Sequence, residues 1–211
     1  MKTRFVPRQA LLLLLALCAC ADALAFVVTI NPGQRAVYLR VGDGVFTGTY
    51  DSGGTPGSGG GINTVSVAVP AGAVGNGVAQ AMTSDATQLT SNWDGYAFCN
   101  LPSEVYIGGF HRRPGNTAST ATLSVTAPAS LVNGSGDTIA FSQISWTSSG
   151  NGDGTAAQPV PAGSFTGGAQ TLASFPSNTW RESCHSFRYA NAQVVAAGIY
   201  TGRVTYTLSS P

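Results

Sequence analysis

Apolar and polar residues alternate one by one along most of this chain. Val37, Leu39 and Val41, for example, alternate with Tyr38 and Arg40. In a β-strand successive side chains point to opposite faces, so the alternation gives each strand one apolar face. Such strands with polar turns between them predict an all-β fold, an antiparallel β-sandwich. The same alternation recurs in the ranges 26–30, 65–69, 123–127 and 200–208.

Three segments depart from simple alternation. The apolar residues of 139–141 are out of phase with Ile144, and one extra residue near Gln143, as in a β-bulge, would restore the buried face. The stretch Val78–Leu89 could form a helical turn or two. The glycine-rich segment Asp51–Gly61 is expected to be a hairpin tip, since it lacks the following helix that a phosphate-binding loop requires.

Residues 1–25 are predicted to be a cleaved signal peptide. Three basic residues precede the apolar run 10–19, and Ala23-Leu24-Ala25 matches the small-residue pattern at which a signal peptidase cuts. Cleavage would export a mature chain beginning at Phe26 to the periplasm, the cell surface or the medium. Lipid anchoring at Cys20 is the less favoured alternative. No later segment approaches the apolar length of a transmembrane helix, so none is expected in the mature chain.

Charge and size restrict the classes of function. The leader holds three of the ten basic and one of the nine acidic residues, which leaves a nearly neutral mature chain without lysine. This composition argues against nucleic acid as a partner and against a polybasic membrane-binding surface. The range 26–211 is expected to form one β-sandwich domain, with 114–118 as the place where it could divide into two subdomains.

Two cysteines remain after processing, Cys99 and Cys184. In an oxidising compartment an isolated pair in a small exported domain predicts a disulfide. The alternative is a catalytic thiol with His185 or His111 as its base. His185 follows its cysteine directly, and neighbouring side chains of a strand point to opposite faces, so the disulfide is favoured.

Motifs for catalysis, metals and cofactors are missing from the sequence. There is no nucleophile elbow and no zinc-protease or Cys-x-x-Cys motif, and nothing places Glu104 beside Glu182 as a glycosidase would require. Asn151–Gly154 hints at a calcium turn but lacks the carboxylates of a calcium-binding loop. We therefore expect no enzyme activity, no metal and no cofactor.

Two groups of residues are candidates for binding a ligand. His111, Arg112 and Arg113 form the only cationic cluster and could hold an anion or a sugar acid, although a solvated turn after the strand 105–107 is favoured. Trp93 and Trp180 lie in loop-like surroundings near the two cysteines. Packing around the disulfide is their favoured role, and stacking on sugar rings is the alternative.

The carboxyl-terminal half contains the segments ASTATLSVTAP (118–128), IAFSQISW (139–146) and AGIYTGRVTYTL (197–208). With these segments it resembles the spore coat protein U family and the related Csu-type pilus subunits. Proteins of this kind have an immunoglobulin-like fold that lacks one strand, which an extended segment of a neighbour completes. The resemblance implies that the partners of this chain are other copies or related surface subunits, and a periplasmic chaperone. The final strand of the family has five characteristic positions, here Ala197, Gly198, Tyr200, Val204 and Leu208.

Strand donation would need an extended apolar segment. Phe26, Val28 and Ile30 directly follow the cleavage site and could anchor such a donor strand, although a role as the chain's own first strand is favoured. The leading hypothesis is an exported, non-catalytic structural or adhesive surface protein, such as a fimbrial subunit. The alternative is a secreted carbohydrate-binding module that uses Trp93, Trp180 and the turn His111–Arg113.

Overall fold

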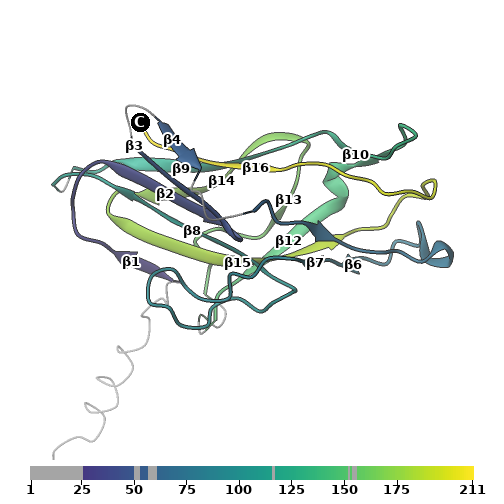
Figure 1. Cartoon of the computed structure of the whole chain (residues 1–211), viewed down its shortest axis with the longest axis horizontal. Coiled ribbons are helices and arrows are strands. Elements are labelled where there is room, and N and C mark those ends of the chain that lie inside the picture. Colours follow the sequence, from purple (N-terminus) through teal and green to yellow (C-terminus); the bar gives the residue numbers. More distant parts are fainter. Residues whose placement is uncertain (1–25, 50–52, 57–60, 116, 152, 154–155) are drawn as a thin grey trace, which may run out of the picture.

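A computed structural model describes residues 26–211 except 50–52, 57–60, 116, 152 and 154–155. Within this part the chain forms β-strands that run along the long axis of the molecule (Figure 1), and two short 3₁₀ turns, η1 (Ala71–Ala73) and η2 (Phe141–Gln143). The strands are β1 (Val27–Thr29), β2 (Ala36–Val41), β3 (Gly44–Thr49), β4 (Gly53–Pro56), β5 (Val65–Ser66), β6 (Gln80–Ala81), β7 (Thr83–Ser84), β8 (Val105–Arg112), β9 (Thr120–Ala127), β10 (Ser130–Val132), β11 (Thr138–Ala140), β12 (Ile144–Ser149), β13 (Gly163–Ser164), β14 (Gly168–Pro176), β15 (Thr179–Tyr189) and β16 (Thr205–Ser209).

The long strand β15 organises the larger of the two main sheets. The strand order is β13-β12-β15-β8-β2-β3-β4, and β1 and β6 also pair with β15. The start of β15 pairs with both β1 and β8, and its end pairs with both β12 and β6. Since a strand has two edges, β1 and β12 share one edge of β15, and β8 and β6 share the other. This sheet therefore joins strands from both sides of the segment 114–118.

A smaller antiparallel sheet, β14-β9-β16, packs against the larger one. The side chains between the sheets come from alternate positions of the strands, as the period of two requires. The predicted all-β, antiparallel sandwich is confirmed. One core cluster consists of Val37, Leu39, Ile107, Ala121, Leu123, Val160, Ala173, Phe175 and Leu208. A second cluster consists of Ala86, Val105, Val125, Ala127, Phe141, Ile144, Trp146, Phe165 and Phe187.

Several predicted elements differ from the observed ones. The phase of the buried face between β11 and β12 is restored by the 3₁₀ turn η2, and not by a β-bulge. The range 78–89 contains β6 and β7 in place of a helical turn. Within the glycine-rich segment 51–61, residues 53–56 form β4 and pair with β3, so the expected hairpin tip is wrong there.

Two observed strands are shorter than the alternating ranges that predict them. In the range 65–69 only Val65 and Ser66 join a ladder, with β7. The final strand begins at Thr205, and in the preceding segment Thr201 makes only an isolated bridge to Val132. Alternation sets which side chains face inward, but a ladder also needs a neighbouring strand in register.

The proposed signal peptide and Cys20 lie outside the described residues. In the part of the chain that the structure describes, no helix has the length and apolar character needed to cross a bilayer.

Candidate functional site

The larger sheet has an outer face, which points away from the smaller sheet. Because Val37, Leu39 and Ile107 point into the core, their neighbours Tyr38 and Tyr106 point to this outer face. Residues 85–104, between β7 and β8, cross it, and we call them the covering loop.

A disulfide fixes the covering loop to the sheet. Cys99 of the loop is bonded to Cys184 of β15, with their Cα atoms 5.6 Å apart, and both are buried. The predicted disulfide is confirmed, so the thiol pair is not a free nucleophile. His185 lies on the opposite face of β15, where its ring stacks on Trp146 at 5.6 Å between centroids.

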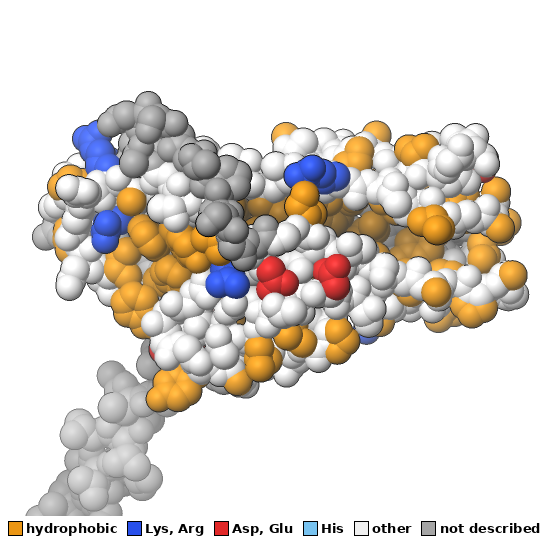
Figure 2. Space-filling view, viewed as in Figure 1, with side chains coloured by type: hydrophobic (Ala, Val, Ile, Leu, Met, Phe, Trp, Pro, Cys, Tyr) orange, Lys and Arg blue, Asp and Glu red, His pale blue; other side chains and the backbone are white. Residues whose placement is uncertain are grey.

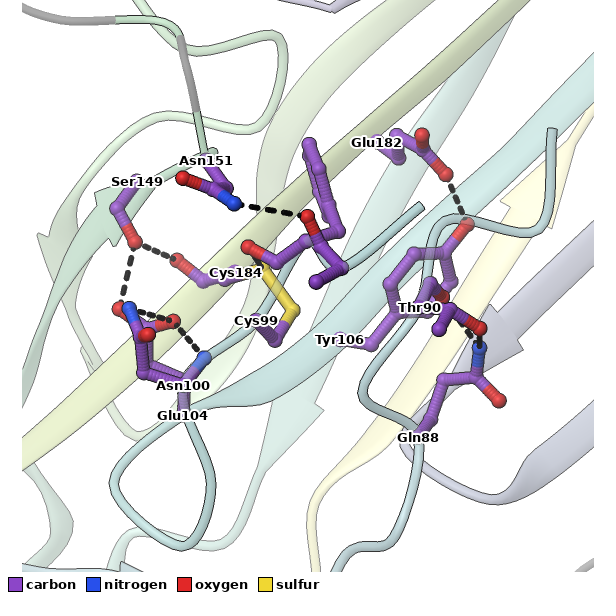
Figure 3. Close-up of a disulfide and its surroundings, with 12 residues drawn as sticks. Gln88, Thr90, Cys99, Asn100, Glu104, Tyr106, Ser149, Asn151, Glu182 and Cys184 are labelled. Carbon is purple, nitrogen blue, oxygen red and sulfur yellow. Dashed lines mark hydrogen bonds between the residues drawn. A yellow bond between two sulfur atoms is a disulfide. The ribbon is translucent and has the colours of Figure 1, made fainter. Parts of the chain in front are cut away.

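Hydrogen bonds secure the loop next to the disulfide (Figure 3). The Glu104 carboxylate accepts hydrogen bonds from the backbone N–H of Asn100, at 2.6 Å, and from the Ser149 hydroxyl, at 2.7 Å. Asn151 donates from Nδ2 to the Ala97 carbonyl, at 2.9 Å. The loop is thus attached to both β12 and the segment after it.

A buried carboxyl group lies beneath the loop. Glu182 of β15 is fully buried and accepts a hydrogen bond from the Tyr106 hydroxyl (Figure 3). Burial raises the pKa of Glu182, and burial beside Glu182 also raises the pKa of Tyr106. Since Glu182 is inaccessible, this pair serves the structure and offers no group to a substrate.

The Tyr106 ring occupies space that a side chain at position 108 would need. A Cβ on Gly108 would lie 2.1 Å from the Tyr106 hydroxyl oxygen. We expect Gly108→Ala to destabilise the fold by about 1–3 kcal/mol, because it displaces the tyrosine and deprives the buried Glu182 of its donor. Urea unfolding measures this. Gly134→Ala is the matched control, as its Cβ would contact nothing within 4 Å, and equal stability of the two variants would contradict the expectation.

Three aromatic side chains cluster on the outer face, and the ring centroids of Tyr38 and Trp180 are 5.7 Å apart. Tyr38 of β2 lies opposite Phe110 of β8, and Phe110 lies opposite Trp180 of β15. The ring centroids of Phe110 and Trp180 are 5.9 Å apart, and those of Tyr38 and Phe110 are 5.7 Å apart. Trp93 of the covering loop adds a fourth ring, 6.1 Å from Trp180.

Hydrogen bonds hold the loop segment that presents Trp93. The Ser91 hydroxyl accepts from the backbone N–H of Trp93 at 3.0 Å, and Asn92 donates to the Tyr38 hydroxyl at 2.8 Å. Arg40 in turn donates to the Asn92 side-chain oxygen at 3.3 Å. These bonds hold Trp93 in place, although the residue stays 46% exposed.

A small depression lies beside these rings, and we call it the aromatic pocket. Arg112 borders it, with its guanidinium carbon 5.7 Å from the Phe110 ring centroid, and donates from Nε to the Gln34 carbonyl at 3.2 Å. On the surface above β2 and β8, hydrophobic side chains gather beside basic ones (Figure 2). The pocket has a volume of about 270 Å³ and is lined by Ile30, Asn31, Trp93, Phe110, Arg112 and Trp180.

The structure divides the predicted ligand-binding residues into two groups. Trp93, Trp180 and Arg112 meet in the aromatic pocket. His111 points into the opposite face and is fully buried, with Nδ1 3.3 Å from the Phe175 carbonyl oxygen. Arg113 does not line the pocket, and its backbone N–H donates to the Asn178 side chain at 2.9 Å.

Two expectations about these residues are wrong. The strand β8 continues to Arg112, so His111 and Arg112 belong to a strand and not to a solvated turn. The two tryptophans do not pack around the disulfide. That position is taken by Phe98 and Tyr106, with Phe26 against them.

The proposed donor segment is paired within its own chain. β1 forms an antiparallel ladder with the start of β15, in which Val28 lies opposite Trp180. Phe26 packs against Phe98, with ring centroids 5.7 Å apart, and Ile30 lines the aromatic pocket. Val27–Thr29 therefore forms a strand within its own chain here.

Among the described residues, one group of three side chains of the types that bind metal ions lies close together. It contains Cys99, Glu104 and Cys184, but both sulfurs belong to the disulfide. The calcium-like turn 151–154 is only partly described, and Asp153 accepts a hydrogen bond from Gln158 at 3.2 Å.

No protein-family model, curated protein or solved structure matches this chain.

Proposed function

We propose that this chain is an exported, non-catalytic adhesive protein that binds a carbohydrate in the aromatic pocket. The observation that carries the proposal is the half-exposed Trp93 ring beside Trp180 and Arg112. Flat aromatic faces stack on the apolar faces of sugar rings, and a nearby guanidinium donates hydrogen bonds to hydroxyl or carboxylate oxygens. Small-ligand sites combine mainly apolar walls with a few placed polar groups, and this pocket has that character.

The composition of the pocket supports binding in preference to catalysis. None of its lining residues is a carboxylate, a histidine or a nucleophile. Glu182 lies two residues after Trp180 on the same face of β15, and it is fully buried. The covering loop also gives the rigidity that binding needs, since the disulfide and the Asn92–Tyr38 hydrogen bond fix Trp93 before a ligand arrives.

Replacing Trp93 with alanine should weaken carbohydrate binding at least tenfold (about 1.4 kcal/mol or more), because aromatic anchors dominate such contacts. The measurement is isothermal titration of the purified protein with a panel of neutral and acidic oligosaccharides. Tyr96→Ala is the matched control, since Tyr96 is in the same loop, is 77% exposed and does not line the pocket. Absence of binding by the wild-type protein, or equal loss in both variants, would contradict the proposal.

Assembly into a fimbrial polymer is a second candidate. Among the described residues, β14 and β16 each pair only with β9, so each has a strand edge to offer. A neighbouring copy could add a strand there. The pairing of β1 with β15 argues against Phe26–Ile30 as the donor. Pairing with other subunits and with a periplasmic chaperone stays a prediction from the sequence resemblance.

A further inference from the structure

A second groove opens at the side of the sandwich, on the opposite face of β15 from the aromatic pocket. It lies between β1 and β15 of the larger sheet and β14 of the smaller one, and the segment 157–161 forms another wall. Its volume is about 520 Å³, which is in the range of small-molecule sites. We call it the lateral groove, and its lining includes Val27, Gln158, Pro159, Thr171, Ser174 and Arg181.

Among the residues that the structure describes, Arg181 is the one charged residue that lines this groove. It is half-buried, and burial lowers the pKa of its guanidinium group. Within the described part of the chain its side chain makes one hydrogen bond, from Nε to the Thr179 hydroxyl at 3.4 Å, and no ion pair. Its neighbours across the sheet are Val27 on β1 and Gly109 on β8, which carry no charge. A guanidinium group taken partly out of water without a counter-charge favours an anion.

The rest of the lining is mostly apolar but includes polar groups. The lining includes the exposed residues Thr171 and Ser174, and the buried Gln158 Oε1 has no hydrogen-bond donor among the described residues. The ladder between β14 and β9 shifts register between Thr171 and Ala173, at this groove. Such irregularities redirect side chains and often lie next to binding sites.

We infer that the lateral groove binds a small organic carboxylate, with Arg181 as the residue that holds the anion. A guanidinium group donates two parallel hydrogen bonds to the two oxygens of a carboxylate. Val27, Pro159 and Pro161 offer contacts to an organic body, which an inorganic anion such as sulfate would not use. The site is independent of the aromatic pocket, because Arg181 and Trp180 point to opposite faces of β15.

The test is an NMR titration that follows the backbone amides and the arginine Nε–H groups of the wild-type protein. Benzoate is the probe, benzamide is its neutral match in shape, and sulfate is the inorganic alternative. We expect a saturable shift of the Arg181 Nε–H signal and of groove amides with benzoate. Benzamide and sulfate should bind at least tenfold more weakly, which the carboxylate preference of the guanidinium group requires.

Matched variants separate this site from the aromatic pocket. Arg181→Gln should abolish the benzoate shifts, whereas Arg188→Gln, an exposed arginine of the same strand, should retain them. Trp93→Ala should also retain them. Lack of saturable benzoate binding, equal binding of benzamide, tighter binding of sulfate or retention in Arg181→Gln would overturn the inference. If Arg181→Gln does not fold, the wild-type shifts and their absence with benzamide still decide.

Discussion

Replacing both Cys99 and Cys184 with alanine is expected to lower the free energy of unfolding by about 4–5 kcal/mol. The disulfide joins residues 85 positions apart, and the loss of chain entropy in the unfolded state has this size for a loop of that length. For a domain of this size the loss corresponds to a melting temperature lower by about 10–15 °C. Thermal unfolding followed by circular dichroism measures it. The oxidised wild-type protein should be lighter than its reduced form by the mass of two hydrogen atoms.

The same variant also tests how the aromatic pocket is organised. Besides the disulfide, the hydrogen bonds of Glu104 with Ser149 and of Asn92 with Tyr38 anchor the covering loop to the sheet. We therefore expect the double variant to keep its β-sheet spectrum while Trp93 becomes more mobile, which lowers the total tryptophan fluorescence anisotropy. Ser103→Ala is the control, because this exposed hydroxyl bonds only within the loop. Cysteines that react with alkylating reagent in the folded, exported protein, or an unchanged melting temperature in the double variant, would contradict this prediction.

The sequence alone predicts the fold class well because alternation reports directly on burial. Val37 and Leu39 in β2, and Leu123 and Val125 in β9, are buried as their period of two indicates. Alternation also holds where the ladder is short, as Val65 shows. Where the chain bends, as at the 3₁₀ turn 141–143, the pattern shows that the phase must change but not which turn changes it.

The candidate site is only partly predictable from the sequence, because the alternation of residues does not determine which distant segments pair as strands. Trp93 and Trp180 could be selected by residue type, yet their meeting depends on the covering loop crossing β15. Residue type alone does not single out Tyr38 and Phe110, although each alternates with buried residues and so faces outward. The same argument would have separated His111 from Arg112, once β8 is known to continue beyond residue 107.

Buried His185 makes the stability of this protein depend on pH. Its Nε2 lies 3.2 Å from the Val160 carbonyl oxygen, and since a carbonyl can only accept, Nε2 carries the proton. Nδ1 is buried without a hydrogen-bond partner among the described residues, so a second proton there would be an unpaired charge beside the Trp146 ring. Burial therefore lowers the pKa of His185 to about 4, from 6.5 in an unfolded chain.

The sign of the effect follows from which state takes up the proton. Above pH 6.5 His185 is neutral in both states, and its contribution to stability is complete. As the pH falls from 6.5 towards 4, His185 binds a proton in the unfolded chain but not in the folded protein. Unfolding should thus become easier by about 3 kcal/mol over this interval, given about 1.4 kcal/mol for each unit of pKa difference. His111, whose pKa burial also lowers, acts in the same direction, whereas the raised pKa of Glu182 acts in the opposite one.

Comparison of the wild-type protein with His185→Gln isolates this contribution. Glutamine does not titrate and can still donate a hydrogen bond to the Val160 carbonyl, while His111 and Glu182 titrate alike in both proteins. We expect urea unfolding to show the wild-type protein losing about 3 kcal/mol more than the variant between pH 7 and pH 4. A stability difference between the two proteins that stays constant over this interval would mean that His185 is protonated inside the fold. The stack on Trp146 would then have to accommodate an imidazolium ion, which the apolar surroundings of Phe187 and Val160 oppose.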